Sequence, residues 1–181
     1  MKKSILFIAL VAATGAMFAQ KKTTTSATIN FDATTSLDAL PKAENKTVIA
    51  AIDPIKGTLA FELPMKNFTF GNPRMQEHFN GPKWLDSEKY PTAGFKGSIT
   101  NLAAIDFKKN GAYDAEVAGD LTIHGVTKPV KTIGKIIVAG KAVTANTEFT
   151  IKLEDYAVDA PQIAAGKIAK EPKITVSAEM Q

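Results

Sequence analysis

The strongest constraint on the fold is an alternation of apolar and polar residues over Tyr113–Ile123. Odd-numbered positions in this run carry apolar or small side chains, and even-numbered positions are mostly acidic or polar. A period of two predicts a β-strand with one buried and one solvent-facing side. His124-Gly125 then interrupts the pattern, because glycine accepts backbone angles that other residues avoid. A second alternating run, Pro129–Val138, follows Thr127-Lys128, so the two runs predict a β-hairpin.

The same alternation recurs along the chain, and we expect about eight strands joined mostly by short turns. Lys109-Asn110-Gly111 predicts a hairpin turn, whereas Asp32–Asn45 and Leu153–Pro172 are expected to be loops. No strand–helix–strand rhythm is present, so the chain is predicted to be one all-β domain, an antiparallel barrel or sandwich. The other predicted strands are Thr23–Phe31, Lys46–Ile52, Ile55–Leu63, Ala93–Ile99, Val143–Ile151 and Ile174–Ala178.

One stretch breaks the strand rhythm and predicts a short helical insert near residues 73–89. Asn72 is positioned as an N-cap, with Pro73 at the first helical position. Gly81-Pro82 would end the helix, and a second turn runs from Trp84 to Tyr90. One helical face carries Met75, His78 and Phe79. This insert is the one predicted non-strand element that could cover the mouth of a barrel.

The first residues have the pattern of a secretory signal peptide. Lys2-Lys3 precedes an apolar run that is too short to span a bilayer as a helix. We expect cleavage after Ala19, which makes residues 1–19 a signal peptide and residues 20–181 the exported domain. The short basic and apolar parts are typical of bacteria, so we expect a periplasmic or secreted protein without stable membrane insertion.

Composition argues against several classes of function. The chain has no cysteine and two histidines, so thiol chemistry is absent and transition-metal ligands are scarce. No nucleophile elbow, phosphate loop or zinc-protease motif occurs, so we expect no enzyme, no cofactor and no metal. The net charge of +4 falls to +2 once the two signal-peptide lysines are removed. Positively and negatively charged residues are interspersed along the chain and form no basic block, so we expect no nucleic-acid partner.

The predicted inward faces carry several small residues, which have two interpretations. They could leave the interior of a barrel open to one small ligand, or they could mark bends and close strand packing. The usual role of glycine in strands favours the second. An open apolar interior would suit a lipid tail, since a five-carbon prenyl unit would contribute about 3 kcal/mol at about 0.8 kcal/mol per buried methylene. These residues are Gly57, Ala93, Gly97, Ala115, Gly119, Gly134 and Ala145.

Two ordered motifs carry a resemblance to a known family. The run GDLTIHGVTKPV, Gly119–Val130, resembles the signature hairpin of the YceI-like lipid/polyisoprenoid-binding family, and Met75–Ile99 resembles its helical insert and the following strand. The resemblance implies a lipocalin-like barrel of about eight strands with a long apolar pocket. It also implies a polyisoprenoid ligand, such as a prenyl quinone or prenyl diphosphate, and a binder or carrier without catalytic activity. Many members have an Arg-Asp pair before the histidine of the insert. Here the sequence is Arg74-Met75-Gln76-Glu77-His78, so no head-group contact is carried over from that pair.

We therefore predict an exported protein that carries or stores a long-chain isoprenoid lipid, acting alone or as a homodimer. The alternative is an exported structural or interaction protein whose barrel core is filled. His78 either meets a ligand head group or packs on the helix, and His124 is expected to hydrogen-bond the backbone from its turn. The predicted pocket and mouth residues are Phe68, Met75, His78, Phe79, Trp84, Leu85, Tyr90, Phe95, Val117, Leu121, Ile123 and Phe149.

Overall fold

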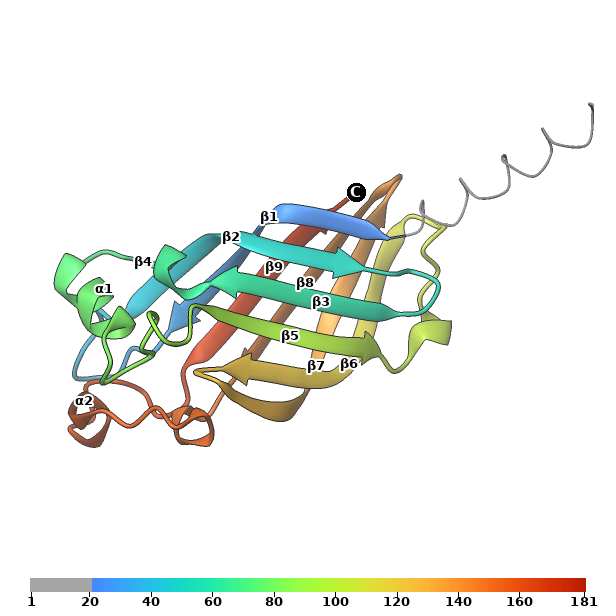
Figure 1. Cartoon of the computed structure of the whole chain (residues 1–181). Coiled ribbons are helices and arrows are strands. Elements are labelled where there is room, and N and C mark those ends of the chain that lie inside the picture. The colour runs from blue at the N-terminus through green and yellow to red at the C-terminus, as the bar shows by residue number, and fades with distance from the viewer. Residues whose placement is uncertain (1–20) are drawn as a thin grey trace, which may run out of the picture.

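Antiparallel strands form a closed barrel in the computed structural model, which describes residues 21–181 (Figure 1). The predicted signal peptide, residues 1–19, and its cleavage site lie outside the described residues. The sheet order is β1-β9-β8-β7-β6-β5-β3-β2-β4, and an additional β1–β2 pairing closes the barrel. The lipocalin-like antiparallel architecture is therefore confirmed, with β4 as a short extra strand beside β2. The strands are β1 (Lys22–Asp32), β2 (Lys42–Ile52), β3 (Thr58–Pro64), β4 (Thr69–Phe70), β5 (Thr92–Ile99), β6 (Gly111–Ile123), β7 (Val126–Ala139), β8 (Ala142–Thr150) and β9 (Lys173–Met180).

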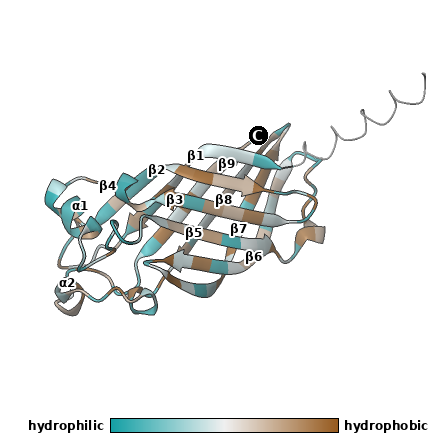
Figure 2. Cartoon of the chain, viewed as in Figure 1, coloured by the Kyte–Doolittle hydropathy of each residue, from teal (hydrophilic) through white to brown (hydrophobic). Residues whose placement is uncertain are grey.

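The predicted hairpin is the longest ladder of the sheet. β6 and β7 pair from Gly111↔Val138 to Ile123↔Val126, so only His124 and Gly125 form the turn. Their φ angles are 52° and 73°. Positive φ at both central residues is the turn geometry that matches the twist of two antiparallel strands. Alternation along the strands is visible in the hydropathy colouring of Figure 2, where brown and teal segments follow one another.

Most of the helical segments gather at one end of the barrel (Figure 1). The predicted insert contains α1 (Pro73–Asn80), and the Asn72 side chain caps α1 by accepting the Arg74 N–H at 2.9 Å. A 3-10 turn, η1 (Met65–Asn67), precedes the insert. Residues 81–91 form turns and no second helix. The predicted loop Leu153–Pro172 contains two short helices, η3 (Leu153–Tyr156) and α2 (Pro161–Ala164). η2 (Leu102–Ala104) lies between β5 and β6, at the opposite end.

The predicted turn at Lys109-Asn110-Gly111 is wrong. β6 begins at Gly111, and β5 pairs only with its second half, from Ile99↔Val117 to Gly94↔Thr122. A longer connection containing η2 therefore links the two strands. Asn110 instead contacts the neighbouring hairpin, since its side-chain oxygen accepts the Gly140 N–H at 2.8 Å.

The predicted loop Asp32–Asn45 is too long, because β2 already begins at Lys42. Asn45 is polar and suggests a loop, yet it is fully buried in the strand. Its amide nitrogen donates to the Pro64 carbonyl at 2.9 Å, and its oxygen accepts from both N–H and hydroxyl of Thr47. A buried polar group that is fully hydrogen-bonded is compatible with a strand. At the next connection, β3 begins at Thr58 and not at Ile55, because residues 53–57 form a turn.

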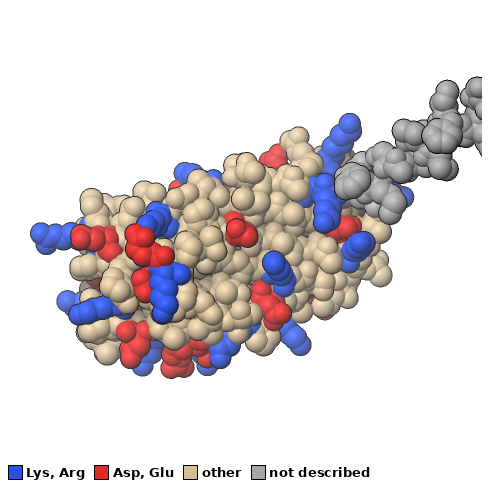
Figure 3. Space-filling model, viewed as in Figure 1, with Lys and Arg blue, Asp and Glu red and all other residues tan. Residues whose placement is uncertain are grey.

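Charges of both signs are intermingled on the face of the molecule that Figure 3 shows. The described ion pairs join exposed or partly exposed side chains, such as Lys135 and Asp114 at 2.7 Å. Exposed pairs contribute little to stability, so packing inside the barrel is the main source of its stability. Within residues 21–181, no helix has the length and apolarity needed to cross a membrane.

Candidate functional site

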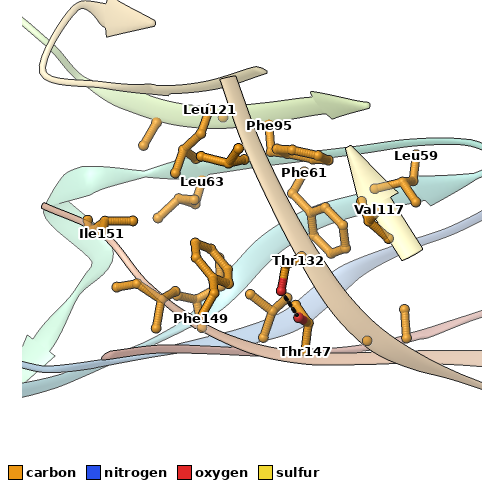
Figure 4. Close-up of a pocket in the computed structure, with 18 of the residues that line it drawn as sticks. Leu59, Phe61, Leu63, Phe95, Val117, Leu121, Thr132, Thr147, Phe149 and Ile151 are labelled. Atoms are coloured by element: carbon orange, nitrogen blue, oxygen red, sulfur yellow. Dashed lines mark hydrogen bonds between the residues drawn. The ribbon is translucent and has the colours of Figure 1, made fainter. Parts of the chain in front are cut away.

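The barrel encloses an apolar cavity of about 150 Å³. Its wall combines inward-facing side chains of the strands with Met65, Phe68, Phe79, Leu85 and Leu153 from the connections at the α1 end. Figure 4 shows the labelled side chains converging on this space. The strand residues that line the cavity are mostly those that the alternation predicts to face inward, because every second residue of a barrel strand points inward.

Eight of the twelve predicted site residues border the cavity, and four do not. Met75, His78 and Trp84 line a second hollow of about 260 Å³ on the outer side of the α1 end. Tyr90 packs edge-on against the His124 ring, with ring centroids 4.6 Å apart. The eight residues at the cavity are Phe68, Phe79, Leu85, Phe95, Val117, Leu121, Ile123 and Phe149.

Phe79 separates the cavity from the second hollow. Both spaces share Phe79 and Phe31 as wall residues. The Phe79 ring contacts Phe31, Phe68 and Phe70, with centroid separations of 5.7, 5.3 and 4.9 Å. Tilted and edge-on pairs of this kind stabilise a cluster beyond the area they bury. α1 therefore closes this end of the barrel with a packed aromatic cluster.

The small residues on the inner face divide between the two predicted roles. Ala93, Ala115 and Ala145 border the cavity, so their small size leaves open space. Gly97 and Gly119 are paired across β5 and β6, and a Cβ on either would overlap the partner strand and the Phe95 ring. These two glycines allow close approach and do not widen the cavity.

Sequence reasoning missed part of the wall. Leu59, Phe61 and Leu63 of β3 border the cavity, and their alternation in the sequence was a sufficient signal. Thr132 and Thr147 also border it, and their hydroxyl oxygens lie 3.0 Å apart (Figure 4). Nothing in the sequence marks this pair, because it depends on how β7 and β8 meet.

His124 has the structural role that its turn position predicts. Its Nδ1 donates to the carbonyl oxygen of Tyr156 at 3.0 Å, which ties the β6–β7 hairpin to η3. Burial, together with the neighbouring Asp155 carboxylate, raises the pKa of the Tyr156 hydroxyl. His78, by contrast, is exposed on α1.

The cavity offers little acid–base or metal chemistry. Among the residues that the structure describes, no group of three histidine, aspartate or glutamate side chains could hold a metal ion. Lys135 is the charged residue that residues 21–181 contribute to the cavity wall, and it directs its ammonium group to Asp114 on β6. What the site can do is remove an apolar group from water.

The fold and the cavity define a class, antiparallel barrels with an apolar interior. The chain belongs to the YceI-like family, since residues 11–180 match the YceI-like domain. A UPF0312 protein of Pseudomonas putida W619 is 29% identical over 114 residues, which cover 60% of this chain and 56% of that protein. Protein YceI of Escherichia coli is 31% identical over 109 residues, 57% of this chain and 51% of that protein. The chain thus spans little more than half the length of the curated relatives it matches.

Two solved structures share the fold at low sequence identity. A polyisoprenoid binding domain from Saccharophagus degradans superposes with a TM-score of 0.75 at 12% identity, covering 90% of this chain and 98% of that one. Burkholderia cenocepacia BcnA gives a TM-score of 0.70 at 20% identity, with 86% and 96% covered.

Proposed function

We propose that this protein binds a lipid by holding its apolar chain inside the barrel. The observation that carries the proposal is the cavity, which is enclosed by strands and walled almost entirely by apolar side chains. Burial of an apolar group in such a space is favourable in proportion to the area removed from water. Convergent polar groups would be needed for catalysis, and binding requires none.

The length of the cavity, more than its volume, favours a chain-like ligand. An apolar cavity of about 150 Å³ stays dry and takes up small apolar molecules. Its wall extends from Phe79 and Leu85 at the α1 end to Met180 near the far end of β9. Such an elongated space suits a tail one chain wide, and each prenyl unit of it would contribute about 3 kcal/mol before association costs.

A polyisoprenoid is the chain we favour, because the fold neighbour from Saccharophagus degradans is described as a polyisoprenoid binding domain. Carriage or storage of the lipid, as a monomer or homodimer, is the role we propose. The filled barrel without a ligand is the weaker candidate, since open space remains between the side chains of the wall.

Extraction of the purified protein with organic solvent, followed by mass spectrometry, tests the proposal. We expect a co-purified prenyl lipid. We also expect added geranylgeraniol to raise the melting temperature, because a ligand at a hundred times its Kd stabilises by about 2.7 kcal/mol. An empty extract together with an unchanged melting temperature over a series of prenyl chain lengths would contradict it.

We further propose that the protein is exported after removal of residues 1–19, supported by the basic and apolar pattern of that segment. Expression of the full chain in a Gram-negative host, followed by fractionation and N-terminal sequencing, tests this. Periplasmic protein that begins at Gln20 is the expected result, and cytoplasmic protein that retains Met1 would oppose it.

A further inference from the structure

The ladder between β7 and β8 ends early. The two strands pair from Ala139↔Ala142 to Gly134↔Thr147 and no further. The first half of β7, Val126–Ile133, pairs with β6 alone. The last residues of β8, Glu148–Thr150, pair with β9 alone. The barrel wall therefore lacks backbone pairing between these two segments, and we call this unpaired region the β7–β8 window.

Side-chain hydrogen bonds bound the window at both ends. At one end, the Thr147 hydroxyl donates to the Ile133 carbonyl at 3.0 Å and lies 3.0 Å from the Thr132 hydroxyl. At the other end, His124 reaches the Tyr156 carbonyl. The window is thus framed, and at the threonine end it is held by side chains in place of a backbone ladder.

The window faces the cavity. Val130 and Thr132 on its β7 edge border the cavity, and so do Phe149 and Ile151 on the opposite edge (Figure 4). Val130 and Phe149 are only half-buried, although both point inward. On the outer side of the same edge, Ile133 is 70% exposed, which is unusual for an isoleucine in a sheet.

Both ends of the barrel offer a worse route. The α1 end is closed by Phe79 and the three rings around it. The opposite end is closed by fully buried side chains, including Val143 and Met180. A long tail that entered through an end would have to displace packed core residues and then thread lengthwise. Entry through the window requires only that two segments without a shared ladder move apart.

We infer that the β7–β8 window is the lateral gate through which an apolar chain enters and leaves the cavity, and that the Thr132–Thr147 pair keeps it shut. This inference rests on the proposed lipid-binding function. Each of the hydrogen bonds that Thr147 makes to Thr132 and to the Ile133 carbonyl joins neutral groups and contributes little to stability. They can therefore break on the timescale of ligand exchange without unfolding the barrel.

Replacement of both threonines by valine tests the gate, since valine keeps the shape and removes the hydroxyl. We expect Thr132→Val with Thr147→Val to release a dansyl-labelled prenyl alcohol to lipid vesicles at least three times faster. The matched control is Thr122→Val with Thr127→Val. That pair has hydroxyls 2.8 Å apart on the outer face of the continuous β6–β7 ladder, and its release rate should equal that of the parent.

A reducible cross-link across the window would hold it shut, whereas the valine substitutions would loosen it. The chain has no cysteine, so Ile133→Cys with Glu148→Cys can be bridged by a short methanethiosulfonate linker across the threonine end of the window. We expect uptake and release to slow at least tenfold and to recover on reduction. Ile137→Cys with Thr144→Cys, a directly paired position in the intact part of the ladder, should have no effect.

The outcomes are separable. Unchanged exchange rates in both window variants, in a protein that still binds the probe, would overturn the lateral gate and leave the proposed function standing. Absence of any probe uptake by the parent protein would overturn the proposed function and the gate together.

Discussion

Two parts of the barrel wall share the same alternating pattern but differ in how deeply their inward residues are buried. On the closed wall, formed by β1, β2 and β9, the inward residues are almost inaccessible, and Val48 and Ala50 are 0% exposed. On the open wall, formed by β3, β5, β6 and the first half of β7, inward residues such as Phe61, Val117 and Leu121 are only half-buried. Val48 and Ala50 pack against their neighbours and do not border the cavity, although other residues of the closed wall, such as Ile52 and Val176, do. These half-buried residues of the open wall all border it.

The difference teaches that alternation places a side chain inside a barrel without filling the interior. The closed wall pairs medium and small residues that interlock, as at Ala27↔Val48. On the open wall, the absence of side chains at Gly97 and Gly119 lets the Phe95 ring lie close against the strands. The ring therefore takes up less of the barrel interior. Cores tolerate neither gaps nor excess volume, so the two walls should respond differently to the same substitution.

An added ring should give the largest contrast. Ala50→Phe on the closed wall has no free space to occupy, so we expect it to lower the free energy of unfolding by about 3 kcal/mol. Ala145→Phe points into the cavity and should leave stability within about 1 kcal/mol of the parent while abolishing lipid binding. Urea unfolding and probe binding measure both effects, and equal destabilisation by the two variants would contradict the contrast.

Truncation should give a smaller contrast of the same sign. Val48→Ala removes two packed methyl groups, so a loss of about 2 kcal/mol is expected from the transfer and cavity terms. Val117→Ala enlarges an existing cavity, and we expect a loss of less than about 1 kcal/mol. Midpoints of urea unfolding without ligand are the measurement. A larger loss at Val117 would mean that the open wall is packed in solution.

The contact between His124 and Tyr156 tests what holds the open wall in place. His124→Asn keeps a residue that tolerates positive φ, but its shorter side chain loses the bond to the Tyr156 carbonyl. We expect a loss of about 1 kcal/mol and faster amide exchange in η3. His78→Asn is the control, because His78 is exposed on α1 and should be neutral.

The smallest effect is expected where the two walls join, at the β2–β3 turn. Backbone N–H groups of Lys56 and Ile55 donate to the Asp53 carboxylate and hold the pKa of Asp53 below its ordinary value of 3.8. Because the folded pKa is lowered, this stabilisation is present above about pH 4 and is lost as the pH falls further.

Asp53→Asn should therefore flatten the acid limb of the stability curve. Thermal melts between pH 2 and pH 7, on the order of one per pH unit, compare the variant with the parent. A variant whose acid limb parallels that of the parent would exclude Asp53 as a source of the pH dependence.

Much of the fold was predictable because local patterns specified it. Alternation located all eight predicted strands to within a few residues of their bounds, and the largest difference is the start of β2, at Lys42 and not Lys46. Asn72 and Pro73 predicted the start of α1, and His124-Gly125 predicted the hairpin turn. The errors occurred where a tertiary partner decided the outcome. Asn45 joins a strand because Pro64 and Thr47 satisfy its side chain, and Asn110 serves a neighbouring turn and not its own.

The candidate site was predictable in part for the same reason. Inward parity identified Val117, Leu121 and Ile123 as residues facing the interior, and they border the cavity. Helical periodicity could not tell which residues of the insert face inward. Phe79 plugs the barrel, whereas Met75 and His78 lie on the outer hollow, because the orientation of α1 depends on the Phe31, Phe68 and Phe70 rings.

The alternation and turn residues of the sequence determined antiparallel strands with one apolar side, because both signals act locally. Closure of the sheet into a barrel depended on the long-range β1–β2 pairing. Whether the interior would be full or empty was decided only by the tertiary structure, because volume depends on which side chains meet across the barrel. The tertiary structure also decided the β7–β8 window, because the point at which two paired strands separate depends on both strands and not on the local sequence of either.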